Sequence, residues 1–332
     1  MRKNGPWILA LLVYGILYFL DDSASKLLTF LLATALAQGS ILLVAAAELS
    51  NAKWILPLRK PLMEMWPLFF IPTLADPDIA LYAWSHHPTA WLNAAGVTFR
   101  SHILFIVSFA IAMMFISAMR KGSEGRRAWA VVYIFSFVIS HTVMAVDQVM
   151  SFDYPWTSTM FPALYMVEAL YAGLTLAGIL CFFLGRRGAC PPATLKDTAT
   201  LTFGFSLFWG GLFFAQYLTI WYANIPEEVH YLQARFQLPW GNALFYGAVI
   251  LLFAVPFFSL LANPLRRVAG AVLAIDGVIL AGLLAYRVFH LLPHVAISPL
   301  FLVLQLAALA GAVGWLVRIS IAEAEFDSRN IT

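Results

Sequence analysis

Charged residues are scarce in this chain of 332 residues, where Asp, Glu, Lys and Arg together make up only 11%. A typical soluble domain carries about 25% charged residues. Hydrophobic residues, by contrast, make up 62% of the chain. This composition excludes a soluble globular protein and leaves no room for a separate soluble domain. The net charge of +3 comes from Lys and Arg beside apolar segments, so it does not indicate nucleic-acid binding.

Cysteine is equally rare, and the two that are present, Cys181 and Cys190, do not form a Cys-x-x-Cys pair. The chain therefore lacks the thiolate pattern of an iron–sulfur cluster or a zinc site, and the attachment motif of a c-type haem. A b-type haem between His102 and His141 is disfavoured, because the two imidazoles are expected to differ in membrane depth by about 10 Å at 1.5 Å per residue. We predict no metal, haem or iron–sulfur cluster held by this chain.

Long apolar runs are what the chain has in abundance. About 20 consecutive apolar residues are needed to cross a bilayer as a helix, so the sequence predicts an all-α integral membrane protein with a single polytopic domain over residues 1–332. The third run is interrupted by prolines and is expected to be kinked or partly re-entrant. Ten membrane segments are predicted: Pro6–Leu20, Leu27–Glu48, Trp54–Leu74, Arg100–Met119, Ala128–Met150, Phe161–Leu184, Ala199–Tyr222, Trp240–Leu261, Val268–Val288 and Ala296–Val317.

The distribution of Lys and Arg predicts the orientation of these segments. Sixteen of the 20 basic residues fall in one set of alternate loops, and the other four are Lys26, Arg100, Arg235 and Arg287. The positive-inside rule then places both termini in the cytoplasm. An alternative interpretation treats the first segment as a cleaved signal peptide, which would leave nine spans. On the outer side, Pro226 followed by two glutamates predicts a short surface helix near residues 226–236.

Polar residues inside the apolar segments are the candidate functional residues, because an ionisable group costs several kcal/mol within a bilayer unless it is paired or hydrated. Glu48 is expected at the inner end of its helix, Glu64 and Asp276 near mid-membrane, and Asp147 and Glu168 in the outer third. A carboxylate of this kind can also simply hold two helices together. His290 and His294 are expected to be ordinary residues near the membrane surface.

Two polar stripes are predicted on consecutive helices. Ser136, Ser140 and Asp147 share one helical face at spacings of four and seven residues, with His141 on an adjoining face. On the next segment, Tyr165, Glu168 and Tyr171 form a second stripe, at spacings of three. Facing stripes of hydroxyl, carboxylate and imidazole groups would form a proton-conducting path or a polar pocket.

Two motifs carry a resemblance to a known family. Asp147-Gln-Val-Met-Ser151 followed by Trp156-Thr-Ser-Thr-Met-Phe161 resembles a conserved stretch of a membrane subunit of alternative complex III, a bacterial quinol:electron-acceptor oxidoreductase. Gln216-Tyr-Leu-Thr-Ile-Trp-Tyr-Ala-Asn-Ile-Pro-Glu-Glu228 is similar to a longer motif of the same subunit. This subunit is the F type, quinone-binding subunit 2, of the NrfD-like (polysulfide-reductase) superfamily.

The resemblance implies a multi-pass subunit in the bacterial cytoplasmic membrane. Its partners would be a related NrfD-like membrane subunit, an extracytoplasmic iron–sulfur subunit, c-type cytochrome subunits and the lipid bilayer. Quinol, such as menaquinol, would be oxidised near the outer surface and pass its electrons to the iron–sulfur subunit. In the family this subunit has a proton-path or supporting role.

Together, the residues and the resemblance predict a membrane subunit that supports quinol oxidation in the respiratory chain and carries a proton path. Asp147 is the first candidate for accepting a proton, with His141 and Glu168 as its relay, and His102, Asp147 and Trp156 are candidates for lining a quinone pocket. Two alternatives stay open, a purely structural anchor for the complex and an ion-coupled secondary transporter. The remaining candidates for the proton path are Ser136, Ser140, Tyr165, Tyr171, Glu64 and Asp276.

Overall fold

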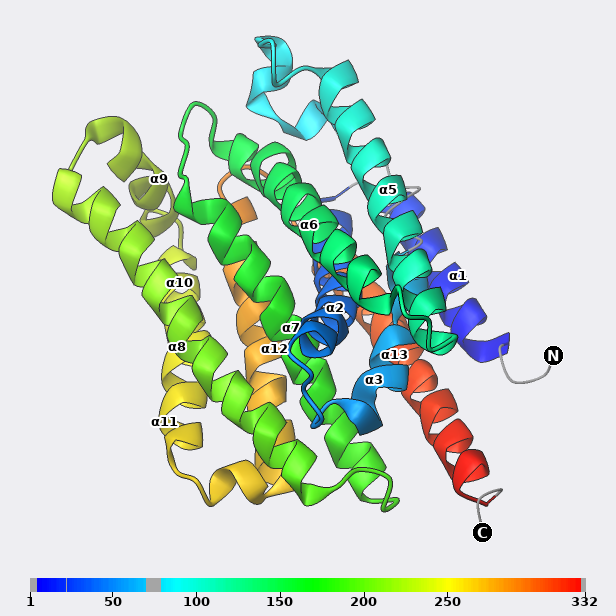
Figure 1. The fold of residues 1–332 in the computed structure, drawn as a ribbon. Coiled ribbons are helices and arrows are strands. Elements are labelled where there is room, and N and C mark those ends of the chain that lie inside the picture. The colour runs from blue at the N-terminus through cyan, green and yellow to red at the C-terminus, as the bar shows by residue number, and fades with distance from the viewer. Residues whose placement is uncertain (1–4, 22, 70–78, 330–332) are drawn as a thin grey trace.

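The computed structural model describes residues 5–21, 23–69 and 79–329, and within these ranges the chain is helical, with no strand (Figure 1). Among these described residues, eight helical segments are long and apolar enough to cross a membrane. The shorter apolar helix α1 (Gly5–Leu20) precedes them. The long helices are α2 (Ser25–Leu49), α5 (Ala94–Arg120), α6 (Arg126–Met144), α7 (Met160–Gly185), α8 (Pro192–Ala223), α12 (Ala269–Leu291) and α13 (Pro299–Arg329), and the eighth segment combines α10 (Gly241–Val249) with α11 (Val255–Leu261).

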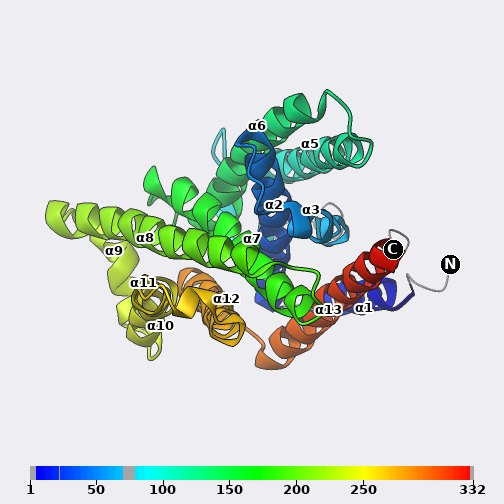
Figure 2. The ribbon, with the colours of Figure 1, turned by 60° about the horizontal axis from the view of Figure 1, so that its bottom comes forward.

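Helices α2 and α7 form the centre of the molecule. Within their apolar windows, 94% of the residues of α2 and 78% of those of α7 are buried, against 28–39% in the other six segments. Figure 2 shows α5 and α6 on one side of this central pair, α8 to α12 on another, and α1 with α13 on a third. The outer helices expose large apolar side chains, among them Phe99, Phe135, Phe208 and Phe258, as a lipid-facing surface requires.

The two central helices approach each other closely because glycines face each other across their contact. A Cβ atom at Gly39 of α2 would lie 1.8 Å from the carbonyl oxygen of Ala169 in α7, and one at Gly173 of α7 would lie 2.5 Å from the backbone of Gly39. Small residues permit this backbone contact between membrane helices, where packing replaces the hydrophobic effect as the driving force.

Two helices begin earlier than predicted. Helix α5 starts at Ala94 instead of Arg100, because the side chain of Asn93 caps it by accepting a hydrogen bond from the backbone N–H of Gly96 at 2.8 Å. Helix α8 starts at Pro192 instead of Ala199, and proline is well tolerated in a first turn. These polar turns extend apolar segments, so hydropathy alone does not locate their ends.

The third predicted segment, Trp54–Leu74, is not one continuous helix. It forms α3 (Leu56–Met63) and a 3₁₀ turn at Trp66–Phe69, whereas its last residues, 70–74, lie outside the described part of the chain. Eight residues of α-helix span only about 12 Å, well short of the roughly 30 Å of a bilayer core. The prolines that interrupt the sequence account for this break.

A proline also alters the segment that contains α10 and α11. Pro256 lacks an N–H group, and the turn before it, Ile250–Ala254, is a π-helix. The carbonyl of Leu252, four residues before the proline, accepts a hydrogen bond from the Tyr171 hydroxyl at 3.0 Å. Tyr171, predicted to belong to a proton path, thus satisfies a carbonyl that the helix itself cannot bond.

The short helix predicted near residues 226–236 is α9 (Pro226–Phe236), which has Pro226 in its first turn together with two glutamates. Asn224, in the left-handed conformation with φ of 47°, ends α8 and turns the chain into α9.

Candidate functional site

Asp147 lies in a π-helical turn, Ala145–Val149, that interrupts the end of the α6 segment. Its carboxylate is almost fully buried and accepts hydrogen bonds from Arg100 Nε and from Trp91 Nε1, both at 2.8 Å. The Arg100 guanidinium also stacks on the Trp91 ring, 4.1 Å from its centroid. Both carboxylate oxygens therefore bind donors, one from Arg100 in α5 and one from Trp91 in the loop before it, which gives Asp147 a structural contact that the sequence did not reveal.

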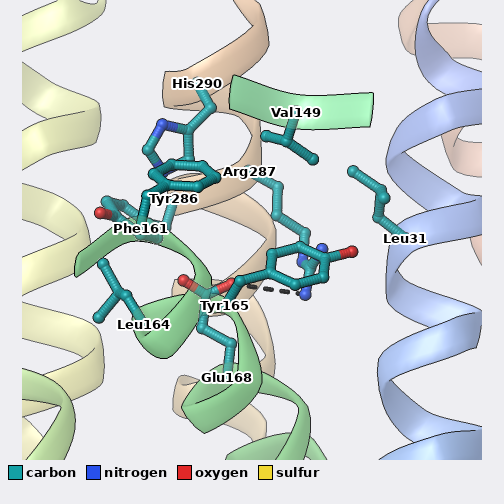
Figure 3. Close-up of a pocket in the computed structure, with 9 residues that line it drawn as sticks. All are labelled: Leu31, Val149, Phe161, Leu164, Tyr165, Glu168, Tyr286, Arg287 and His290. Carbon is teal, nitrogen blue, oxygen red and sulfur yellow. Dashed lines mark ion pairs between the residues drawn. The ribbon is translucent and has the colours of Figure 1, made fainter. Parts of the chain in front are cut away.

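Glu168 forms a second buried ion pair, and it lies deep in the central helix α7. Its Oε2 atom lies 3.4 Å from Arg287 Nη2 of α12, and the two side chains are 4% and 3% exposed. The Arg287 guanidinium also lies over the Tyr165 ring, 4.9 Å from its centroid (Figure 3). Because α7 supplies both Tyr165 and Glu168 on one face, the predicted α7 stripe meets a cation from α12.

This cluster has more polar groups than hydrogen-bond partners. None of the three nitrogens of the Arg287 guanidinium has a hydrogen-bond partner in the described part of the chain, and the same is true of the Tyr165 hydroxyl. A cavity of about 10 Å³ lies between them, lined also by Tyr286 and His290 (Figure 3). A cavity of this size accommodates roughly one water molecule, and buried polar groups that lack partners are where such waters bind.

His290 connects the cavity with α9. It is buried rather than at the surface as predicted, and its Nδ1 atom lies 2.6 Å from the Tyr231 hydroxyl. The prediction was wrong because α9 folds back over the end of α12 and covers this histidine. Burial raises the pKa of Tyr231 above its usual range, so the hydroxyl keeps its proton and can donate it in a hydrogen bond to His290.

Arg235 of α9 connects α9 with the end of α12 and with Asp153. Its five N–H groups match five acceptors: both oxygens of Asp153, at 2.8 and 2.9 Å, and the backbone carbonyls of Tyr231, Phe289 and His290. Burial alone would lower the pKa of Arg235, but the neighbouring Tyr231 and Asp153 raise it above its ordinary value. The fully bonded Arg235 contrasts with Arg287, whose guanidinium lies in the same region of the protein with a single ion pair.

His141 adjoins the Glu168 cluster without joining it through a hydrogen bond. The imidazole is fully buried, stacks on Phe137 with ring centroids 3.9 Å apart, and lies 5.7 Å from the Tyr165 ring. Neither of its ring nitrogens has a hydrogen-bond partner within the described ranges. The structure thus places His141 beside Tyr165 and leaves the imidazole without a hydrogen bond to any described residue, whereas Ser136, Ser140 and Asp147 of the predicted α6 stripe have other contacts.

A second small cavity lies beside the α6 stripe. It has a volume of about 10 Å³, and its polar lining consists of Gln38, Ser101, Ser140 and Gln148. Both polar atoms of the Gln38 amide lack a hydrogen-bond partner among the described residues, as does Oε1 of Gln148. Ser140 therefore faces a second water-sized space, separate from the one beside Glu168.

Glu64 is not near mid-membrane as predicted. Its carboxylate is 25% exposed and forms an ion pair of 2.7 Å with Arg120, the last residue of α5. The error follows from the broken third segment, because α3 ends at Met63 and places Glu64 at the level of a loop. Glu48, in contrast, lies at the basic end of α2 as predicted, where it pairs with Arg59 and Arg126.

The remaining predicted path residues lie apart from one another. Ser136 exchanges a hydrogen bond of 2.7 Å with Ser108 of α5, a contact between neighbouring helices. Asp276 is fully buried against α7, where a Cβ at Gly178 would lie 2.0 Å from its Oδ2, and neither of its oxygens has a partner among the described residues. Asp276 and Ser136 therefore contact different neighbours from those of the Glu168 cluster.

The three residues predicted to line a quinone pocket have separate contacts. Trp156 stacks on Tyr231 with ring centroids 3.9 Å apart, and His102 bonds the carbonyl of Thr98 through Nδ1 at 2.9 Å. Asp147 is occupied by Arg100, as described above. These contacts do not join the three side chains into one pocket.

The cations that complete both ion pairs, Arg100 and Arg287, were not among the site residues predicted from the sequence. Arg100 and Arg287 belong to the four basic residues that fall on the minority side of the charge distribution, within or beside apolar runs. That position was a signal, because an arginine at membrane depth needs a partner. The described residues contain no cluster of three or more His, Cys, Asp or Glu side chains suited to a metal ion.

The fold and these buried polar clusters define a helical, multi-pass membrane protein. Comparison with protein-family models and with curated proteins returned no match for the chain.

Proposed function

We propose that this chain is a membrane subunit of a quinol oxidoreductase complex of the alternative complex III type, and that it carries protons released by quinol oxidation. The two motifs that resemble the family support this assignment, together with the predicted topology. The predicted topology has ten segments and places both termini in the bacterial cytoplasm. The chain would have this topology if α1 and the broken third segment each cross the membrane. Helix α2 ends at one end of the bundle and residues 79–86 lie at the other (Figure 1), which supports the second crossing.

The observation that carries the proposal is the Glu168–Arg287 pair beside a cavity that accommodates about one water. Oxidation of a quinol releases two protons, which need an acceptor and a route to water. With one water in this cavity, Glu168, His290 and Tyr231 would form a sequence of hydrogen-bonding groups leading from α7 towards α9. Protons can pass along such a chain without any one residue ionising permanently.

Glu168 suits the role of proton acceptor better than Asp147. Both oxygens of Asp147 already accept short hydrogen bonds from Arg100 and Trp91, and a proton on this carboxylate would disrupt them. Glu168 has a longer contact of 3.4 Å and borders a cavity large enough for about one water molecule. His141 and Tyr165 lie on its other side as further candidate groups of the relay.

Neither the predicted pocket residues nor the cavity beside Glu168 fits a quinone. The predicted pocket residues His102, Asp147 and Trp156 do not converge, and the cavity beside Glu168 is far smaller than the roughly 300 Å³ at which ligand pockets begin. We therefore place the oxidation of quinol in the related membrane subunit of the complex, with this chain receiving protons. Electrons would pass to the extracytoplasmic iron–sulfur and c-type cytochrome subunits.

The test is quinol oxidation by the purified, intact complex carrying Glu168→Gln or Asp147→Asn. General acid–base groups contribute roughly 10²-fold or more to a rate, so we expect Glu168→Gln to lower turnover by about that factor and Asp147→Asn to have a smaller effect. Glu64→Gln, which alters a partly exposed carboxylate, is the matched control. Haem content reports assembly.

Normal turnover of an assembled Glu168→Gln complex would refute the proton-path role and leave the subunit as a structural anchor. A larger loss with Asp147→Asn than with Glu168→Gln would return the role to Asp147.

A further inference from the structure

A large groove, separate from the cavity beside Glu168, carries an inference that is independent of the proposed function. Helices α2, α7, α12 and α13 line it, and its volume is about 770 Å³. This volume is within the range of about 300–1,000 Å³ typical of ligand pockets. In Figure 2, α13 lies beside α1 and apart from α12. Most of its lining is aliphatic, including Leu32, Leu36, Leu176, Ile179, Leu280 and Leu306.

Two arginines border the groove, and both belong to the basic end of the bundle. Arg187 follows the last residue of α7 by two positions, and Arg318 lies in the C-terminal half of α13. The Arg318 guanidinium lies 5.0 Å from the centroid of the Trp315 ring, one turn earlier on the same helix. Tryptophan and arginine together are typical of the membrane–water interface.

The length of the groove restricts what can occupy it. Along α13 it extends from Leu306 to Arg318, a distance of about 18 Å at 1.5 Å per residue. One leaflet contributes about half of the roughly 30 Å hydrocarbon core. The groove therefore covers one leaflet, the one on the basic side, whereas a transmembrane helix of a partner would need a contact along the whole core.

We propose that this groove binds one anionic phospholipid from the leaflet on the basic side. The phosphate would lie at the level of Arg187 and Arg318, and an acyl chain would extend along the leucines of α2, α7 and α13. Basic residues at the cytoplasmic ends of transmembrane helices bind anionic headgroups, and arginine forms strong bonds with phosphate. The combination of an apolar groove with two cations at one end distinguishes a charged lipid from a neutral one.

Two glycines of α13 allow the groove to be filled without disturbing the helix. Gly314 lines the groove, and a Cβ atom built there would meet no atom within 4 Å. Gly311, one turn away, has equally open space at its Cβ but does not line the groove. Gly314→Trp should therefore block the groove, and Gly311→Trp is its matched control.

The experiment measures lipid bound to the full-length protein, purified from membranes in mild detergent with the subunits that accompany it. Native mass spectrometry would follow titration with dioleoyl phosphatidylglycerol or with dioleoyl phosphatidylcholine, which has the same acyl chains. We expect the protein to bind one molecule of phosphatidylglycerol tightly and to bind phosphatidylcholine with lower affinity. A basic residue contributes about 1 kcal/mol to the binding of an anionic lipid, so Arg187→Gln and Arg318→Gln should each lower the affinity for phosphatidylglycerol about fivefold.

The controls separate this proposal from its competitors. Arg186→Gln, at the neighbouring position but outside the groove, should leave the affinity unchanged, and Gly314→Trp should remove both lipids while Gly311→Trp removes neither. Equal binding of the two lipids, or equal effects of Arg186→Gln and Arg187→Gln, would overturn the proposal. So would extraction of a quinone in place of phospholipid, or a Gly314→Trp protein that keeps its lipid and loses another subunit.

Discussion

Breaking the buried pair between Glu168 and Arg287 is the perturbation whose consequences the structure predicts most sharply. The charges lie 3.4 Å apart with both side chains at most 4% exposed. At an effective dielectric constant of about 20, two unit charges at this distance attract each other by about 5 kcal/mol. Removing one partner of a buried pair leaves the other charge uncompensated, which typically costs about 3–5 kcal/mol.

We therefore expect Glu168→Gln and Arg287→Gln each to lower the free energy of unfolding by about 3–5 kcal/mol. The double variant should be more stable than the sum of these losses implies, because two neutral amides leave no unpaired charge. The coupling between the two sites should reach about 3 kcal/mol, at the upper end of what contacting residues show.

The assay is a double-mutant cycle on the full-length protein, with the free energy of unfolding obtained from SDS titration in mixed micelles. Arg120→Gln supplies the control, since its ion pair with Glu64 is largely exposed and is expected to contribute only about 0–1 kcal/mol. Additive losses, within about 0.5 kcal/mol, would refute the reasoning, because they would mean that Glu168 and Arg287 do not stabilise each other.

Three further predictions concern the contacts around this pair. Arg235→Lys replaces five donors with three, so it should leave buried carbonyls unbonded and lower stability by about 2–4 kcal/mol, measured by the same titration; an unchanged midpoint would contradict the role of Arg235. Gly39→Ala should destabilise by at least about 1–3 kcal/mol because its Cβ would meet the α7 backbone, whereas Gly15→Ala, with open space, should not; similar midpoints for the two would argue against the α2–α7 contact. Trp91→Phe removes one donor to Asp147 and should cost about 1 kcal/mol, with turnover of the complex largely retained; a large loss of turnover would restore Asp147 as a proton-path residue.

The local features of the sequence predicted most of the helices. Apolar runs located α2 and α7 to within a few residues, since a membrane helix must bond all its backbone groups within itself. Pro226 and the two following glutamates located α9, because the preference of proline and acidic residues for a first turn acts within one helical turn. Helix starts were less accurate where a polar turn such as that at Asn93 precedes the apolar run.

The pairing of buried charges depended on the tertiary structure. Periodicity placed Glu168 on one face of α7, but the rotation and depth of α12 decided that Arg287 would meet it, and no local pattern contains that information. The π-helical turn that carries Asp147 changes its direction relative to an ideal helix and points it to Arg100. His290 is buried only because α9 returns across the end of α12.

By itself, then, the sequence determined that the chain is a bundle of apolar helices with most of its basic residues at one end, because hydropathy and charge act residue by residue along each segment. Only the tertiary structure decided which carboxylate borders a water-sized cavity, which one is held by donors on both oxygens, and where a groove opens between α12 and α13. Those outcomes depend on helix crossing and axial shift, which arise from contacts between residues far apart in the chain.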